Sequence, residues 1–280
     1  MNKLTYGIVL LSILFGFIGC ANTQPTKDNL AKWEQDCQTQ KEVTSNNSTI
    51  FAAGECIDYH IAQGENKDSV IVVLHGAHTD GGNPMSWMPK WGRYTSTSTD
   101  ITTYILAMPG YGSSTSNRFG KMIWTNHLVP SAQLDYIKFT AEILKKIKDK
   151  HNANNLYVFG HSSGADLATT ISGLFPNLIQ KAIAYAGAYD YPYYFKRWKN
   201  YSPHFEVAPT HYVNKIQDTK ILLLAGEKDQ LSLPKFTKHY EQILLDNNVN
   251  VTSFVIKNAK HSLRDVVIWD KAIAFINEDK

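Results

Sequence analysis

The chain has 280 residues and a formal net charge of +3. Without a short leader, about 260 residues remain, which suits one α/β domain with a full hydrophobic core. Because the basic residues form no concentrated run, the composition does not indicate a nucleic-acid-binding protein.

The first 19 residues have the features of a bacterial export signal. Lys3 precedes an apolar run over residues 8–18, which is shorter than the roughly 20 residues of a membrane-spanning helix and is typical of a signal-peptide core. The run ends in Phe17-Ile18-Gly19-Cys20, which resembles the bacterial lipoprotein lipobox with phenylalanine in place of the usual leucine. The sequence therefore predicts a signal peptide over 1–19, a lipidated Cys20, and a tether with an N-terminal extension over 20–48. An ordinary secretory signal and a membrane anchor are the alternatives.

A lipidated Cys20 would place the protein in the cell envelope, anchored to a bacterial membrane. By resemblance to enteric sorting rules, Ala21 favours the outer membrane, facing the periplasm or the surface; without lipidation the protein would be secreted. In this oxidising compartment Cys37 and Cys56 flank a polar loop and are candidates for a disulfide. The alternative is a buried free thiol at Cys56, which lies in an apolar alternating stretch.

Apolar runs of strand length alternate with helical patterns over the rest of the chain. Strands are predicted at about 50–61 (one or two strands), 70–74, 102–107, 156–159, 182–186, 221–225 and 251–256. A helix is predicted to start at Asn83-Pro84 and to carry Trp87 and Trp91. Further helices are predicted over 131–150, 165–175 and 263–278, and one more is predicted to end at residues 247–249. This frequent alternation predicts an α/β fold with a mainly parallel sheet that is covered by helices on both faces.

The predicted strand at 156–159 and the helix at 165–175 are joined by Gly160-His161-Ser162-Ser163-Gly164. This G-x-S-x-G stretch is typical of a nucleophile elbow, a tight strand-to-helix turn that presents a strained serine. The glycines are needed because neighbouring chain passes close to the turn. Ser162 is therefore the candidate nucleophile, and the helix N-terminus points at the developing oxyanion.

A serine nucleophile needs an imidazole base and a carboxylate, which follow the serine in the order acid, then histidine. Asp229 follows the strand at 221–225 and is the candidate acid, with Glu227 and the more distant Asp190 as competitors. His261 follows the strand at 251–256 and is the candidate general base, the alternative being a surface loop histidine.

The loop after the strand at 70–74 is expected to supply part of an oxyanion hole. The hole needs one backbone N–H from the residue after the nucleophile and one from this loop. Ser163 supplies the first and Ala77 the second, with His78 as the alternative. His75 and His78 lack carboxylate or cysteine partners at ligand spacing, so we expect no metal site and assign His75 to packing or hydrogen bonding beneath the loop.

These motifs together resemble the α/β-hydrolase superfamily. The matching pieces are HGA at 75–77, PGYGSS at 109–114, GHSSG at 160–164, GEKD at 226–229 and the His261 loop. The resemblance implies an α/β-hydrolase catalytic domain over 49–280 with a small aromatic cap at about 188–213. A weaker likeness over the second half points to dienelactone hydrolases, carboxylesterases and prolyl-oligopeptidase-type catalytic domains.

The segment 185–201 is rich in tyrosine and also carries Lys196, Arg197 and Lys199. Its rings suit an aromatic or acyl group and its cations an anionic group, unless the rings simply pack the cap onto the domain. The sequence predicts a monomeric serine hydrolase that cleaves a small-molecule carboxylic ester through an acyl-enzyme on Ser162, with no cofactor. The alternatives are a serine peptidase or amidase of prolyl-oligopeptidase type, other acyl chemistry such as acyl transfer, and a non-catalytic envelope lipoprotein.

Overall fold

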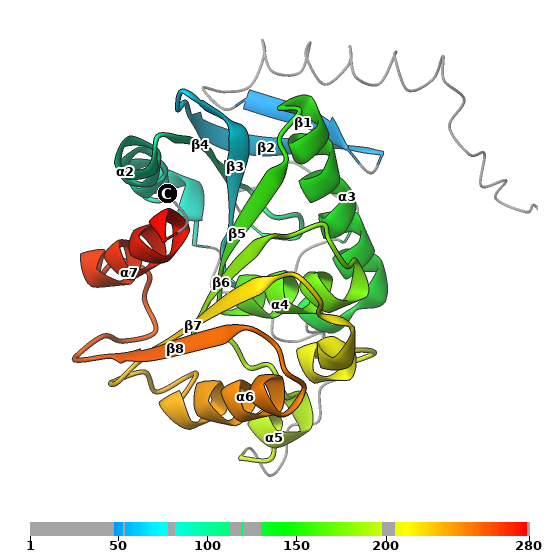
Figure 1. Cartoon of the computed structure of the whole chain (residues 1–280), viewed down its shortest axis with the longest axis vertical. Helices are drawn as coiled ribbons and strands as arrows, with labels where there is room; N and C mark the ends of the chain where they lie inside the picture. Colours follow the sequence, from blue (N-terminus) through cyan, green and yellow to red (C-terminus); the bar gives the residue numbers. More distant parts are fainter. Residues whose placement is uncertain are drawn as a thin grey trace, which may run out of the picture.

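A computed structural model of the chain describes residues 48–52, 54–77, 82–111, 119, 130–197 and 205–278. An eight-stranded sheet forms its centre, with the strand order β1-β2-β4-β3-β5-β6-β7-β8 (Figure 1). The strands are β1 (Ser48–Ala52), β2 (Glu55–Ala62), β3 (Asn66–Leu74), β4 (Ile101–Leu106), β5 (Asn155–His161), β6 (Lys181–Tyr185), β7 (Lys220–Gly226) and β8 (Val251–Ile256). β2 is antiparallel to both of its neighbours, and every pair from β4 to β8 is parallel. The predicted mainly parallel sheet is confirmed.

Helices cover both faces of this sheet, as the sequence predicts (Figure 1). One face carries α2 (Pro89–Thr99) and α7 (Val266–Asn277). The other carries α3 (Leu134–Lys150), α4 (Ser163–Leu174) and α6 (Pro234–Asp246). The short helix α5 (Tyr191–Phe195) and the 3-10 turns η1 (Pro84–Ser86), η3 (Pro130–Ala132) and η4 (Pro209–Lys215) lie in the connections.

Several helix boundaries differ from the prediction. The helix expected from Asn83 is only the turn η1, which the Asn83 side chain caps by accepting the Met85 N–H. Trp91 belongs instead to α2, which starts at Pro89, because a proline at the first helical position needs no N–H partner. The helix predicted from residue 131 starts at Leu134 after the turn η3, and the helix predicted from residue 263 starts at Val266, where the Asp265 side chain caps it.

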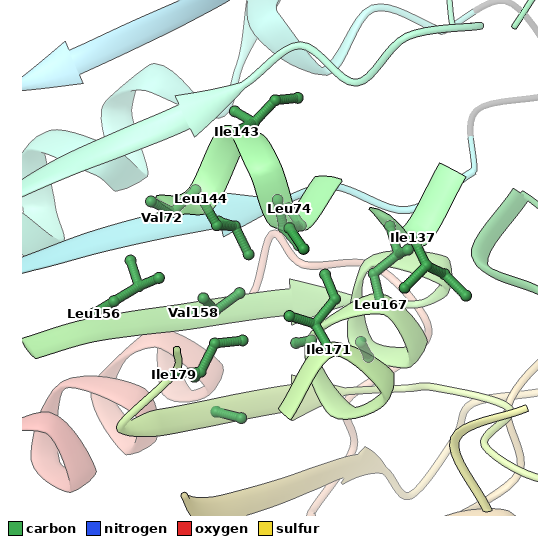
Figure 2. Close-up of a cluster of buried hydrophobic side chains, with 14 of the residues drawn as sticks. Val72, Leu74, Ile137, Ile143, Leu144, Leu156, Val158, Leu167, Ile171 and Ile179 are labelled. Atoms are coloured by element: carbon green, nitrogen blue, oxygen red, sulfur yellow. The ribbon is translucent and has the colours of Figure 1, made fainter. Parts of the chain in front are cut away.

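Apolar side chains fill the space between the sheet and the helices α3 and α4 (Figure 2). The residues labelled there come from β3 and β5, from α3, from α4 and from the entry to β6: Val72, Leu74, Leu156, Val158, Ile137, Ile143, Leu144, Leu167, Ile171 and Ile179. On the opposite face Trp269 of α7 stacks on Trp91 of α2, with ring centroids 5.3 Å apart, and meets Phe159 of β5 edge-on. Side chains of β5 belong to both cores, and β5 leads into the G-x-S-x-G stretch.

The N-terminal predictions fall largely outside the described residues. The predicted signal peptide over 1–19, Cys20 and Cys37 all lie there, and in the described part no helix has both the length and the apolar character to cross a bilayer. Cys56 on β2 takes part in a disulfide bond, so it is not the free thiol considered as an alternative. Its pairing with Cys37 stays a prediction.

A buried lysine caps the last turn of α7. Lys181 on β6 is only 2% exposed, and its ammonium donates to the carbonyls of Phe275 and Ile276 at 2.7 and 3.0 Å. Carbonyl groups at the end of a helix have no partner within the helix and carry the negative end of its dipole.

We expect Lys181→Met to lower the free energy of unfolding by about 2 kcal/mol, because two charge-assisted hydrogen bonds are lost and the carbonyls stay buried. Urea unfolding measures the change. The matched control is Lys145→Met, which removes an exposed ion pair with Asp149 and is expected to cost less than about 0.5 kcal/mol. Equal unfolding midpoints for the two variants would contradict this role of Lys181.

Candidate active site

Ser162 lies at the junction of β5 and α4, in a backbone conformation that residues with a side chain rarely adopt. Its φ is 53° and its ψ is −120°. The turn is fixed because the Ser162 N–H donates to the Tyr185 carbonyl at 2.8 Å and its own carbonyl accepts the Ala165 N–H at 2.9 Å. This is the geometry of a nucleophile elbow, and it directs the side chain away from the sheet at the carboxyl end of β5.

The two glycines of the elbow are required by close approach. A Cβ on Gly160 would lie 2.1 Å from the Gly164 carbonyl oxygen, and a Cβ on Gly164 would lie 2.3 Å from the carbonyl oxygen of Leu74 at the end of β3. No side chain fits at either distance, so the elbow and the neighbouring strand pack directly backbone to backbone. The sequence pattern thus reflects a steric demand of the fold.

The structure brings Ser162, His261 and Asp229 into one hydrogen-bonded chain. The Nε2 of His261 lies 3.1 Å from the Ser162 Oγ, and its Nδ1 lies 2.8 Å from the Asp229 Oδ2. The Asp229 side chain is completely buried, and its Oδ1 accepts the N–H groups of Leu231 and Ser232, both at 2.8 Å. A carboxylate can only accept hydrogen bonds, so His261 carries its hydrogen on Nδ1. Its Nε2 is then free to accept the proton of the Ser162 hydroxyl.

The competing carboxylates have other partners. Glu227 accepts the backbone N–H of Asn258 at 2.9 Å and so ties the loop after β7 to the loop after β8. Asp190 accepts the Tyr193 N–H at the start of α5 and pairs with His239 at 2.9 Å. Of the three acidic residues considered from the sequence, Asp229 is the one that contacts His261.

The loop after β3 passes close to Ser162. A Cβ on Gly76 would lie 2.9 Å from the Ser162 Cβ, and Ala77, the next residue of this loop, is exposed. Ser163 is the first residue of α4, where backbone N–H groups have no partner within the helix. The positions of Ala77 and Ser163 are therefore suited to an oxyanion hole, while His78 lies outside the described residues.

His75 is a buried structural residue of the same loop. Its Nδ1 lies 2.7 Å from the Gly76 carbonyl oxygen and its Nε2 accepts the Met108 N–H at 3.0 Å. The Nε2 contact therefore joins the loop after β3 to the end of β4, while the Nδ1 contact stays within the loop itself. Within the described ranges, no three or more histidine, cysteine, aspartate or glutamate residues are placed to hold a metal ion.

A buried carboxylate beside the site has no clear signal in the sequence. Asp166 lies in the first turn of α4 and accepts the N–H groups of Ala188 and Tyr189 at 2.8 and 3.0 Å and the Tyr191 hydroxyl at 3.3 Å. Burial raises the pKa of this carboxyl to about 7, although the three hydrogen bonds oppose the shift. Asp166 thereby holds the loop after β6, in which Ala186 and Tyr189 both have positive φ. From the sequence, this aspartate looks like an ordinary acidic residue near a helix N-terminus.

Most described rings of the predicted cap pack against the domain. Tyr189 is fully buried and stacks on Tyr240 of α6 at 4.5 Å, and the ring of Tyr194 contacts Phe236 at 5.0 Å. Tyr193, which lies over His239, is 38% exposed. The turn η4, at the end of the predicted cap, packs on α4 near Gly173, about three turns from Ser162. Residues 198–204, including Trp198 and Tyr201, lie outside the described residues.

Comparison with known proteins identifies the architecture. The family described as alpha/beta hydrolase fold matches residues 69–205, and the chain has the α/β-hydrolase fold. No curated protein sequence matches the chain.

Several solved structures share this fold at low identity. Est1E from Butyrivibrio proteoclasticus, solved with ferulic acid bound, has a TM-score of 0.64 and 13% identity over 82% of this chain and 98% of its own. The Pyrococcus furiosus esterase Pf2001 has a TM-score of 0.62 and 15% identity over 87% of this chain and 93% of its own. Dipeptidyl peptidase 4 from Porphyromonas gingivalis has a TM-score of 0.61 and 12% identity over 82% of this chain but only 35% of its own.

Proposed function

We propose that this protein is a serine hydrolase that cleaves a carboxylic ester through an acyl-enzyme on Ser162. The observation that carries the proposal is the unbroken hydrogen-bond chain from Ser162 through His261 to the buried Asp229. The strained elbow supports it, because backbone strain of this kind is typical of functional sites.

In the proposed reaction His261 takes the proton of Ser162 as the serine oxygen attacks the ester carbonyl carbon. The N–H groups of Ala77 and Ser163 stabilise the oxyanion of the tetrahedral intermediate. Collapse of the intermediate breaks the bond to the alcohol, which leaves with the proton from His261. Water, activated by His261, then attacks the acyl-enzyme and releases the carboxylic acid, while Asp229 stabilises the imidazolium in both steps.

An ester is the preferred substrate class because the similar structures matched over more than 90% of their own length include an esterase. A peptidase or amidase is the second candidate, and it rests on the similarity to a dipeptidyl peptidase of which only 35% is covered. Both reactions use the same serine and base. Parallel assays with acyl esters and with aminoacyl or peptidyl amides separate them.

The test of the mechanism is labelling with a fluorophosphonate, which reacts with activated serines. We expect intact-mass spectrometry to show a single adduct on the wild type and none on Ser162→Ala. The matched control is Ser172→Ala, which removes from the same helix a hydroxyl that donates to the Ala168 carbonyl at 2.9 Å. No adduct on a folded wild type, or an adduct that persists in Ser162→Ala, would overturn the proposal.

A further inference from the structure

The catalytic histidine lies in an irregular loop, between the end of β8 at Ile256 and the start of α7 at Val266. Loops are more mobile than the elements they connect, yet a general base must stay within hydrogen-bond reach of its nucleophile. The contact with Asp229 fixes the imidazole ring of His261 but not the backbone that carries it. Other groups must therefore hold the backbone of this loop.

Glu227 bonds this loop at Asn258, three residues before His261, and two further side chains from strand ends reach it at the histidine itself. His161, the last residue of β5, lies with its Nε2 2.7 Å from the carbonyl oxygen of His261 itself. Tyr185, the last residue of β6, donates its hydroxyl to the carbonyl oxygen of the preceding residue, Lys260. Two consecutive carbonyl groups at the catalytic histidine are thus bonded to the rigid end of the sheet.

The chemistry of these contacts is well defined. A carbonyl oxygen only accepts hydrogen bonds, so His161 must carry a hydrogen on Nε2. Tyr185 is fully buried, and burial raises its pKa, so the hydroxyl keeps its proton and remains a donor. The contacts therefore persist while His261 exchanges protons.

The two side chains also pack on each other and on the rest of the site. Their rings are stacked at 5.7 Å, and the ring of His161 lies 5.0 Å from that of His261. A Cβ on Gly76, in the oxyanion loop, would lie 3.0 Å from the His161 Nδ1. The Tyr185 carbonyl accepts the Ser162 N–H, so Tyr185 contacts the nucleophile through its backbone and the histidine loop through its side chain.

We propose that His161 and Tyr185 are positioning residues, which fix His261 over Ser162 by bonding the carbonyls of His261 and Lys260. This inference rests on the proposed serine hydrolase function. Neither contact involves the reacting atoms, so loss of either one lowers the fraction of time that the base is in place. That change lowers kcat and leaves KM nearly unchanged, and a displacement near 1 Å is enough for a loss of about 100-fold.

The test compares matched variants of the full chain, with 4-nitrophenyl butyrate as the ester probe. His161→Phe and Tyr185→Phe keep a ring and remove the donor, and we expect each to lower kcat about 10- to 100-fold with KM within about twofold. His161→Gln retains an N–H donor and is expected to recover part of the loss. Because both residues act on one loop, the double variant should lose less than the product of the two single losses.

Tyr104→Phe is the control variant. It removes the hydroxyl that bonds the His151 Nε2 at 2.7 Å, on β4, which is separated from β5 by β3, and should leave kcat within about twofold of the wild type. Losses of kcat in His161→Phe and Tyr185→Phe that are no larger than in Tyr104→Phe would overturn the inference. The inference would also be overturned if the losses of kcat in the two single variants multiply in the double variant and follow only the fall in melting temperature.

Hydrogen–deuterium exchange of the segment 257–265 gives a readout that does not depend on turnover. We expect faster exchange there in both phenylalanine variants and unchanged exchange in Tyr104→Phe. Unchanged exchange in all variants would refute the role of His161 and Tyr185 whatever the activity. An inactive wild type with faster exchange in the two variants would refute the ester hydrolase and uphold the positioning of His261.

Discussion

Asp229→Asn is expected to lower kcat about 10⁴-fold at neutral pH without unfolding the protein. The reason lies in the two N–H groups of Leu231 and Ser232, which both point at the Asp229 Oδ1. In the asparagine variant they hold the amide oxygen at that position, so the NH2 group takes the place of Oδ2 and donates to the His261 Nδ1. The imidazole hydrogen is then forced onto Nε2, which no longer accepts the proton of Ser162.

The measurement is the steady-state rate of ester hydrolysis by the wild type and the variant at equal folded concentration. Glu227→Gln is the matched control, because its amide oxygen still accepts the Asn258 N–H and it lies two residues from Asp229. We expect the kcat of this control to stay within about threefold of the wild type. A large loss in Glu227→Gln together with a small loss in Asp229→Asn would assign the acid to Glu227.

Asp166→Asn is expected to make the protein more stable than the wild type as the pH rises. The folded pKa of Asp166 is about 7 and its ordinary value is 3.8, so the native state binds the proton more tightly than the unfolded chain. This tighter binding contributes to the free energy of unfolding of the wild type. The contribution has its full value below about pH 4, falls between the two pKa values and is lost above about pH 7. Asparagine is always neutral and lacks this loss, which amounts to at most about 4 kcal/mol.

The asparagine side chain fits the same partners. Its oxygen can accept the N–H groups of Ala188 and Tyr189, and its NH2 group can donate to the Tyr191 hydroxyl, which lies 2.9 Å from the Ser131 Oγ. Urea unfolding at pH 5 and pH 8 measures the difference between variant and wild type. We expect the free energy of unfolding of the variant, relative to that of the wild type, to be about 2–3 kcal/mol higher at pH 8 than at pH 5. The exposed control Asp149→Asn should show no such shift, and a pH-independent difference for Asp166→Asn would contradict the prediction.

The sequence by itself determined the parts of this protein that depend on local sterics and on the periodicity of apolar residues. Only glycine fits at Gly160 and Gly164, so the elbow leaves a readable pattern around Ser162. The buried strands β3, β5, β6 and β7 appear as short apolar runs, which is how parallel strands covered on both faces are recognised. The order of Ser162, Asp229 and His261 along the chain indicated which residues the fold would bring together.

Only the tertiary structure decided what depends on contacts between distant segments. It showed that Asp229, rather than Glu227 or Asp190, contacts His261, although all three follow strands. It placed Trp91 on α2, where the ring stacks on Trp269, and not on the helix expected from Asn83. It also gave Asp166 its buried partners, which lie 22 to 25 residues further along the chain. His161 and Tyr185 bond the histidine loop across 100 and 75 residues. Such contacts need only a donor at the right point in space, and many residue types at many positions supply one, so no local pattern records them.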